Sequence, residues 1–504
     1  MENGLKIRTK AATPLKTVEH PGSEGGDVYD DAEDQEEPLS PYGHLYHTEF
    51  LNTCIMIIFG FADKALDVDV VKESLEKYFG LHPRFSSKLV KEKWVRSKIN
   101  YQDHIVVLDL DPSIENTDRF LEDYVSDLSS TPFDLSKPLW EFHALNIKTS
   151  YAESVGVFKI HHSIGDGMSL ISLVLSCSRK TSDPEELPSM PLSTRKASKT
   201  SDGAFYGFFI AIWLMLKLMW NTLIGYINLL ASTHFLKDTN DLHNSEFDEC
   251  SRKKIVYRLI SLDDLKLVKN ETNVTINDAV LGVTAAALSR YLHMPSNAEG
   301  SLGTKRDHHK KKLRLRAAVA VNVRKAVGLK DLVDMMENGS KCDWGNTTGA
   351  IVIPIHVTLE KDPLEYVRRA KHVMDQKKLS LEATLSFYTV MSSVKLLGMK
   401  WALKVAYGLT RNVTLVFSTV AGPVEEINFC GHRVTHITPA ARTTDGHPPG
   451  VVIHFMSYMN KMSVAVCANQ DLIPDGHKLL DEVEESLRLM KNAVLQKKLN
   501  KGLS

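Results

Sequence analysis

Apolar residues recur along this chain with the spacing of strands that alternate with helices. Short, nearly continuous apolar runs at residues 53–60 and 154–160 are typical of buried strands. Apolar residues three and four positions apart at 70–78 and 168–175 indicate helices that each turn one face toward a core. Further elements of the same two kinds are predicted at residues 118–126, 140–146, 275–293, 313–322, 348–357, 365–378 and 477–495. Because strand–helix units occur in both halves, we expect an α/β (α+β) fold with two similar lobes.

The composition divides the chain into four segments. Residues 1–40 are acidic and poor in apolar side chains, so we expect them to be disordered. Residues 41–180 and 255–500 carry the strand and helix patterns and are predicted to form an N-terminal and a C-terminal lobe, with residues 181–254 as the linker. In the second lobe, the basic, His-rich residues 304–312 are expected to be a solvated loop, with a clamp for a coenzyme or a lipid as the alternative.

The linker contains the longest apolar segment of the chain, residues 204–236. Its only Lys, Arg, Asp or Glu is Lys217, and a membrane span needs roughly 20 mostly apolar residues. Lys217, Asn221, Gly225 and Asn228 fall at helical spacing and form one thin polar stripe. That stripe fits a helix lying in the membrane interface as well as a spanning helix. A third interpretation is a soluble helical hairpin that breaks at Gly225.

Charge and cysteine content exclude several classes of function. Hydrophobic residues make up 43% and charged residues 24% of the chain, as in ordinary globular proteins. A formal net charge of −1 gives no basic excess, so no nucleic-acid partner is expected. The six cysteines form no Cys-x-x-Cys pair, which argues against a zinc site and for a reducing compartment. We expect no metal.

The run HHSIGDG at residues 161–167 is the strongest candidate for chemistry. It falls between a predicted strand and a predicted helix, at a turn that can direct a side chain into a cleft. Histidine takes up a proton near neutral pH, and His162 is the better candidate base because Asp166 follows it by four positions. His161 is the weaker candidate, with a buried, hydrogen-bonded wall residue as the alternative. Asp166 can touch the ring or brace the turn by pairing with an arginine, and Gly167 leaves room for a substrate.

This run is similar to the His-His-x-x-x-Asp-Gly signature of the coenzyme A-dependent acyltransferase superfamily. Five further segments, in order and spacing, resemble the wax ester synthase/diacylglycerol acyltransferase family, particularly its plant members. They are PLWE at 138–141, ND at 277–278, NVR at 322–324, STVAGP at 418–423 and GVVIHFMSYMN at 450–460. Two places depart from related patterns: Thr419 stands where the family usually has Asn, and CDWGN at 342–346 does not match the Asp-Phe-Gly-Trp-Gly run of soluble plant alcohol acyltransferases.

The resemblance implies two acyltransferase lobes with the active site in a tunnel between them. It implies that acyl-CoA, as substrate rather than cofactor, esterifies a long-chain fatty alcohol or diacylglycerol at a lipid membrane. The family's Asp is structural, and its Asn-Asp pair supports activity. The resemblance thus implies that Asn277 and Asp278 support activity. The alternative is that they cap the helix that begins after Thr275. Arg324 is expected to pair with a carboxylate, the alternative being coenzyme phosphates.

Two other functions remain open at this point. One is a condensation-type or small-alcohol acyltransferase of the same superfamily, which the apolar segment disfavours. The other is a non-catalytic lipid-binding scaffold, which the complete His motif disfavours. The expected location is the endoplasmic reticulum membrane or the plasma membrane, with the catalytic lobes on the cytosolic side.

Overall fold

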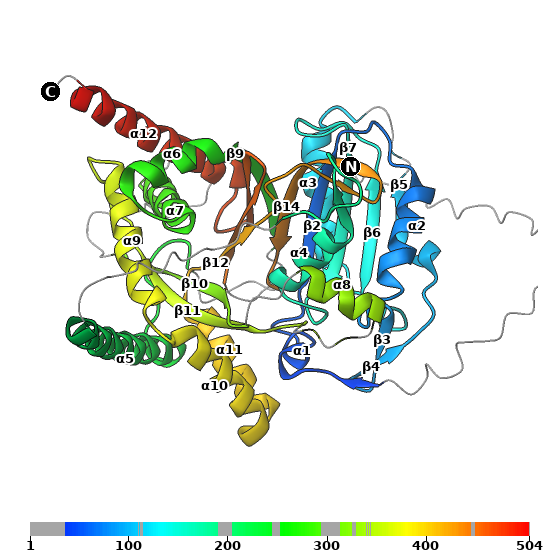
Figure 1. Ribbon diagram of the computed structural model, residues 1–504, viewed down its shortest axis with the longest axis horizontal. Coiled ribbons are helices and arrows are strands. Elements are labelled where there is room, and N and C mark those ends of the chain that lie inside the picture. Colours follow the sequence, from blue (N-terminus) through cyan, green and yellow to red (C-terminus); the bar gives the residue numbers. More distant parts are fainter. Residues whose placement is uncertain are drawn as a thin grey trace, which may run out of the picture.

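The computed structural model places two lobes side by side, each built on its own β-sheet (Figure 1). It describes residues 36–108, 110, 114–189, 204–243, 252–293, 313–324, 329–338, 340, 342, 344–444 and 449–502. The predictions for residues 1–35, for most of the polar linker up to residue 203 and for the loop at 304–312 lie outside the described residues. Residues 36–40, which were expected to be disordered, are ordered: β1 (Glu37–Pro38) pairs with β4 (Lys93–Arg96).

The first lobe is a seven-stranded sheet with helices on both faces. Its strand order is β5-β6-β7-β2-β14-β13-β8. The strands are β2 (Cys54–Phe61), β5 (Ile105–Leu108), β6 (Trp140–Leu145), β7 (Ser154–His161), β8 (Ser178–Lys180), β13 (Ile427–Phe429) and β14 (His432–Ala441). Its helices are α1 (Pro41–Leu45), α2 (Val68–Phe79), α3 (Thr117–Ser130), α4 (Gly167–Ser176) and α8 (Leu329–Asn338), with η1 at Tyr101–Asp103. A small sheet of β1, β4 (Lys93–Arg96) and β3 (Ser87–Val90) adjoins it.

Two strands of this first sheet come from far along the chain. β14 pairs antiparallel with β2, and β13 pairs with β8. A Cβ on Gly60 of β2 would overlap the ring of His436 on β14, so glycine is required at this register. The chain therefore crosses to the first sheet after β12 (Leu415–Ala421), a strand of the second sheet, and then returns to the second sheet. Dividing it into lobes at 41–180 and 255–500 assigns residues 427–441 to the second lobe, whereas their hydrogen bonds place them in the first sheet.

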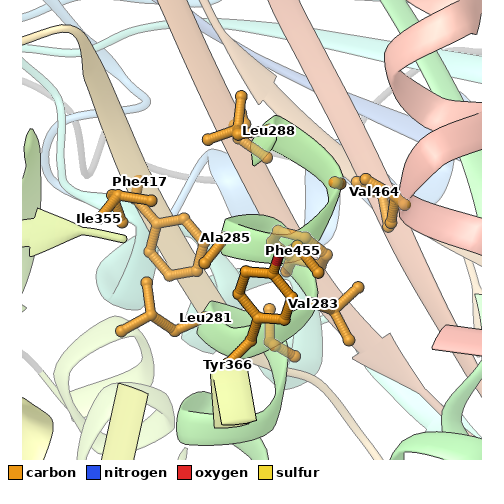
Figure 2. Close-up of a cluster of buried hydrophobic side chains, with 14 of the residues drawn as sticks. Leu281, Val283, Ala285, Leu288, Ile355, Tyr366, Phe417, Phe455 and Val464 are labelled. Carbon is orange, nitrogen blue, oxygen red and sulfur yellow. The ribbon is translucent and has the colours of Figure 1, made fainter. Parts of the chain in front are cut away.

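The second lobe is a six-stranded sheet in the order β11-β10-β12-β15-β16-β9. Its strands are β9 (Lys253–Ser261), β10 (Leu315–Asn322), β11 (Thr348–Ile355), β12 (Leu415–Ala421), β15 (Val451–Tyr458) and β16 (Lys461–Asn469). Its helices are α5 (Ala204–His234), α6 (Leu262–Thr272), α7 (Ile276–Leu292), α9 (Leu364–Lys378), α10 (Glu382–Leu397), α11 (Met399–Asn412) and α12 (Gly476–Gly502). Figure 2 shows the core between sheet and helices, where Leu281 and Leu288 of α7 face Phe417 and Phe455.

A separate apolar cluster joins the two lobes. It combines Met56 of β2 and Val125 of α3 with Tyr257 of β9 and Val452 of β15, all buried. Since burying apolar area contributes about 25 cal/mol per Å², this shared core holds the two sheets in a defined relation. The outer faces of the lobes have cores of their own. Each lobe thus packs around its own core, and the shared cluster fixes the space between the two sheets.

α5, α10 and α11 lie together on the remaining side of the second lobe (Figure 1). α5 runs from Ala204 to His234 without a break, so the hairpin interpretation with a break at Gly225 is wrong. Among the described helices, α5 alone is long and apolar enough to cross a membrane. Its span Phe208–His234 has a mean hydropathy of 1.6, and only 6% of its most apolar window is buried. α10 and α11 were not predicted from the sequence.

Candidate active site

The His motif lies at the turn between β7 and α4, as its flanking patterns predicted. β7 ends at His161, and α4 begins at Gly167. Asp166 is the N-cap of α4, and its Oδ1 accepts a hydrogen bond from the Ser169 backbone N–H at 3.0 Å. Capping satisfies one of the backbone donors that every helix start leaves free. The cap therefore fixes the backbone where the motif turn enters α4.

The imidazole of His162 is half-buried, and one of its nitrogens is enclosed. Nδ1 is shielded from solvent and has no hydrogen-bond partner among the described residues. The ring stacks on Tyr46, with centroids 4.0 Å apart. Burial lowers the pKa of His162, while its own backbone carbonyl, the charge of Asp166 and the Asn346 side chain oppose that shift. The ring is thus favoured in its neutral form, and the opposite nitrogen, Nε2, is the one left for a substrate.

His161 is fully engaged by neighbouring side chains. Its Nδ1 lies 2.6 Å from Ser163 Oγ, and its Nε2 lies 3.0 Å from Asn52 Oδ1. Ser163 Oγ also lies 3.0 Å from His47 Nε2. Burial lowers the pKa of His161 well below its usual value, with His47 and His162 adding to the shift. These contacts fit the alternative of a buried wall residue.

Asp166 faces Arg324 rather than the His162 ring. Its Oδ2 lies 2.5 Å from Arg324 Nη2, and both side chains are buried. The same oxygen accepts hydrogen bonds from the Thr347 N–H at 3.0 Å and the Thr348 hydroxyl at 2.9 Å. The expectation that Arg324 pairs with a carboxylate is confirmed. Asp166 therefore ties the start of α4 to the segment that leads into β11.

That segment, residues 344–348, runs along the whole motif turn. The Trp344 indole N–H donates to Ile164 O at 2.9 Å, and the Asn346 side-chain amide donates to His162 O at 2.9 Å. The hydroxyl of Ser169 lies 3.0 Å from Gly345 O. Since these partners are more than 170 residues apart in sequence, the second half of the chain fixes the backbone that carries the histidine.

The second sheet closes the site from the other side. A Cβ on Gly167 would meet only Val420 of β12, at 3.9 Å, so space remains beside the start of α4. His454 of β15 pairs in register with Ser418 of β12. Burial lowers the pKa of His454 to about 4, with a further lowering by the charge of the nearby His162. His162 and Gly167 thus lie between the two lobes, as the family resemblance implied.

Asn277 and Asp278 lie elsewhere. They are on the first turn of α7, which Figure 1 places in the second lobe, away from α4. Asp278 completes a capping box with Thr275 and pairs with Lys378 at 2.8 Å. Both contacts of its carboxylate stabilise the start of α7. Asn277 is exposed. The capping alternative accounts for Asp278, and the structure does not bring this pair to the histidines.

Sequence reasoning gave no role to Tyr46, Asn346 or His454. The segments that contain Asn346 and His454 were noticed, as the mismatched run at 342–346 and the matching run at 450–460. No local pattern indicates that either reaches the motif, because the contacts arise only from the packing of the two lobes. Tyr46 follows α1 and carries no pattern of its own.

Solved structures show which class of protein has this fold. The wax ester synthase/diacylglycerol acyltransferase from Marinobacter aquaeolei aligns with a TM-score of 0.56 at 18% identity, covering 91% of this chain and 99% of that one. The starter condensation domain of rhizomide synthetase, crystallised with C8-CoA, aligns with a TM-score of 0.52 at 10% identity, covering 91% and 94%. The chain therefore has the two-lobed fold of the coenzyme A-dependent acyltransferases.

Sequence comparison narrows the class. Residues 62–280 match the wax ester synthase/diacylglycerol acyltransferase catalytic domain, and residues 344–491 match the WS/DGAT C-terminal domain. Wax ester synthase/diacylglycerol acyltransferase 11 of Arabidopsis thaliana is 43% identical, covering 92% of this chain and 96% of that protein. Wax ester synthase/diacylglycerol acyltransferase 4 of the same plant is 44% identical, covering 93% of this chain and 92% of that protein. The chain belongs to the wax ester synthase/diacylglycerol acyltransferase family, and it is an acyltransferase.

Proposed function

We propose that this protein esterifies long-chain fatty alcohols, diacylglycerol or both with acyl-CoA, with His162 as the general base. One observation supports this most strongly: His162 is the motif histidine with a free nitrogen, and it lies between the lobes, where two substrates can meet. His161 has both nitrogens occupied by Asn52 and Ser163. We therefore assign His161 to the wall of the site and the chemistry to His162.

In the proposed reaction, Nε2 of His162 removes the proton of the acceptor hydroxyl while its oxygen attacks the thioester carbonyl carbon. A carbon–oxygen bond forms, and the carbonyl electrons move onto oxygen to give a tetrahedral oxyanion. When this intermediate collapses, the carbon–sulfur bond breaks and the sulfur leaves as the thiolate of coenzyme A. The proton held by His162 then passes to that sulfur. One ester and one free thiol result, and no acyl-enzyme forms.

The remaining motif residues position these groups. A base must be neutral to accept a proton, and burial, which lowers the pKa of His162, keeps it neutral at physiological pH. Asp166 is occupied by Arg324 and the cap of α4, so we assign it a structural role. Gly167 leaves the space in which the thioester reaches the ring. Asn277 and Asp278 are assigned to the start of α7, with any influence on activity exerted through the stability of the second lobe.

We also propose that α5 lies in a membrane interface rather than crossing the bilayer. One side of the helix is bonded to the second lobe: the Asn221 amide donates to Leu379 O at 3.1 Å, and Tyr226 shares a hydrogen bond with Thr389 at 2.7 Å. Gly225 lies against the buried carboxylate of Glu382. A spanning α5 would carry these polar groups into hydrocarbon at a cost of several kcal/mol. The proposed location is the cytosolic face of the endoplasmic reticulum.

Replacing the base tests the function. Purified protein incubated with palmitoyl-CoA and either hexadecanol or diacylglycerol is expected to release ester and free coenzyme A. His162→Ala should lower kcat by about 10²–10⁴-fold, the usual contribution of a general base, while its melting temperature stays that of the wild type. A folded His162→Ala variant with full activity would rule out the assignment. Turnover only with an acyl-carrier thioester would favour a condensation-type enzyme instead.

A further inference from the structure

More than half of the exposed large apolar side chains of the described residues lie on α5, α10 and α11. On the helical hairpin of α10 and α11, three exposed apolar side chains gather at the tip: Leu396 is 80% exposed, Leu397 60% and Trp401 54%. Gly398, with φ of +80°, makes the turn between the helices. Contiguous apolar patches of this kind are rare on soluble monomers and mark a binding surface.

Apart from Glu382 at the start of α10, which is buried and paired with Lys377, the charges on the hairpin are of one sign. Between residues 383 and 412 it carries three lysines and one arginine and no Asp or Glu. Lys395, Lys400 and Lys404 are exposed around the apolar tip, and the Lys404 ammonium lies 4.7 Å from the ring centre of Trp401. α5 repeats this arrangement, with Lys217 4.9 Å from Trp213. Aromatic rings with lysines beside them are typical of the interface between hydrocarbon and headgroups.

We propose that α10 and α11 form a docking hairpin whose tip enters the headgroup region of an anionic lipid surface, beside α5. α11 and α10 both pack against α5, so the three helices lie together on one side of the second lobe (Figure 1). A second protein chain would also cover apolar area. An acid-free, lysine-rimmed tip complements a negatively charged lipid surface, because the surface potential attracts each lysine while the leucines leave water.

The base of the hairpin leads back to the active site. Phe387 of α10 stacks on Tyr42 of α1 at 5.5 Å, and Tyr407 of α11 lies 4.9 Å from Phe50. Between those two contacts the chain places Tyr46 against His162. The hairpin therefore adjoins the segment that contacts His162, and we infer that a lipid acceptor reaches the histidine along this segment. This last step rests on the proposed function, whereas docking itself does not.

Vesicle binding without substrate tests the docking. The full-length protein is sedimented with vesicles of phosphatidylcholine alone or of phosphatidylcholine with phosphatidylserine. The tip variant Leu396→Glu/Leu397→Glu should bind the mixed vesicles at least tenfold more weakly than wild type. The triple variant Lys395→Gln/Lys400→Gln/Lys404→Gln should lose the preference for vesicles that contain phosphatidylserine. Its affinity for these vesicles should fall by about fivefold for each lysine replaced. The matched control is Leu135→Glu/Leu359→Glu, two leucines 52% and 56% exposed elsewhere, which should bind as wild type does.

Outcomes of this experiment and of the esterification assay are distinct. Tip and control variants that bind vesicles equally well would overturn the proposal, as would a tip variant whose only change is in oligomeric state. A tip variant that loses vesicle binding but keeps its kcat on detergent-dispersed acceptor supports it. If the wild type binds vesicles through the tip yet forms no ester, the docking surface stands and the proposed function fails.

Discussion

The ring of Tyr46 lies parallel to the imidazole of His162 to within 14°. The next residue repeats the arrangement, since His47 stacks on His161 to within 20° at 4.3 Å. Two consecutive residues after α1 thus cover two consecutive histidines. Stacking leaves the His162 ring few alternative rotamers, because any rotation about its side-chain bonds would break the aromatic contact. The position of the nitrogen that we propose as the base therefore depends on a segment outside the motif.

Tyr46→Ala is expected to lower kcat without changing the fold. An aromatic pair contributes about 0.5–1.5 kcal/mol beyond its buried area, which corresponds to about twofold to tenfold in rate. The loss should appear in kcat more than in KM for acyl-CoA, as the ring positions the base rather than the substrate. Steady-state kinetics of Tyr46→Phe provide the control. Phenylalanine keeps the stacked ring and should retain the wild-type rate, and an equally impaired Phe variant would show that the hydroxyl matters instead.

Asn346→Ala should impair catalysis through the backbone of the motif. The Asn346 amide donates to His162 O at 2.9 Å, and this contact disappears in the variant. Without this donor the motif backbone relaxes and the His162 ring shifts, so kcat should fall by up to about 10²-fold, the cost of a misplacement of about 1 Å. A pH–rate profile distinguishes positioning from simple loss of stability. Because the Asn346 side chain opposes the lowering of the His162 pKa, its removal should move the acidic limb of the profile to lower pH.

An unchanged acidic limb in Asn346→Ala would contradict this role even if the rate fell. The parallel control is Thr348→Val, which removes a hydroxyl from the Asp166 cluster rather than from the His162 carbonyl. That variant should lose stability while its pH–rate profile stays that of the wild type.

Elements with local signals were predictable from the sequence. The helix start at Thr275 is predictable because Asp278, its partner in a capping box, lies three positions away, and the structure forms that box. The motif turn was recognised because a buried strand and a periodic helix flank it on either side. In each case the interacting residues are close in sequence, so the pattern itself contains the contact.

Contacts between distant segments left no such pattern. The pairing of Gly60 with His436, and the approach of Asn346 to the motif, join residues more than 180 positions apart. Apolar runs show that a strand is buried without showing which strand is its neighbour. The hairpin at α10 and α11 was missed for another reason. Its apolar residues face outward, whereas periodicity is interpreted as a face turned toward a core.

Asp166→Asn should destabilise the protein more than its small change in size suggests. The variant leaves the guanidinium of Arg324 buried without its counter-charge, and breaking a buried pair in this way costs about 3–5 kcal/mol. The free energy of unfolding in urea measures the loss. In a double-mutant cycle, adding Arg324→Met to Asp166→Asn should lower the free energy of unfolding little further. The second substitution removes the guanidinium that the first one left unpaired. Strictly additive losses would show that the two side chains act independently.

Acid is expected to destabilise the fold through two fully buried histidines. Burial lowers the pKa of His82 and of His436 to about 3, and the unfolded chain has the ordinary value near 6.5. Below pH 6.5 the unfolded state therefore binds more protons than the folded state, so stability is fully present above pH 6.5 and falls as the pH falls toward 3. Each of the two histidines should lower the free energy of unfolding by about 2 kcal/mol between pH 7 and pH 5. The reason is that each pH unit below the unfolded pKa corresponds to about 1.4 kcal/mol for one proton.

Urea unfolding at pH 7, 6 and 5 measures this slope. His82→Asn is the informative variant, because Asn has an acceptor to replace His82 Nδ1, which accepts from the Arg84 N–H at 3.2 Å, but cannot take up a proton. It should be less stable at pH 7, where the smaller side chain packs less well, and should lose about half of the slope that the two histidines cause. His372→Asn, at an exposed position on α9, serves as the control and should keep the whole slope. A slope identical in His82→Asn and wild type would mean that His82 ionises without unfolding the chain around it.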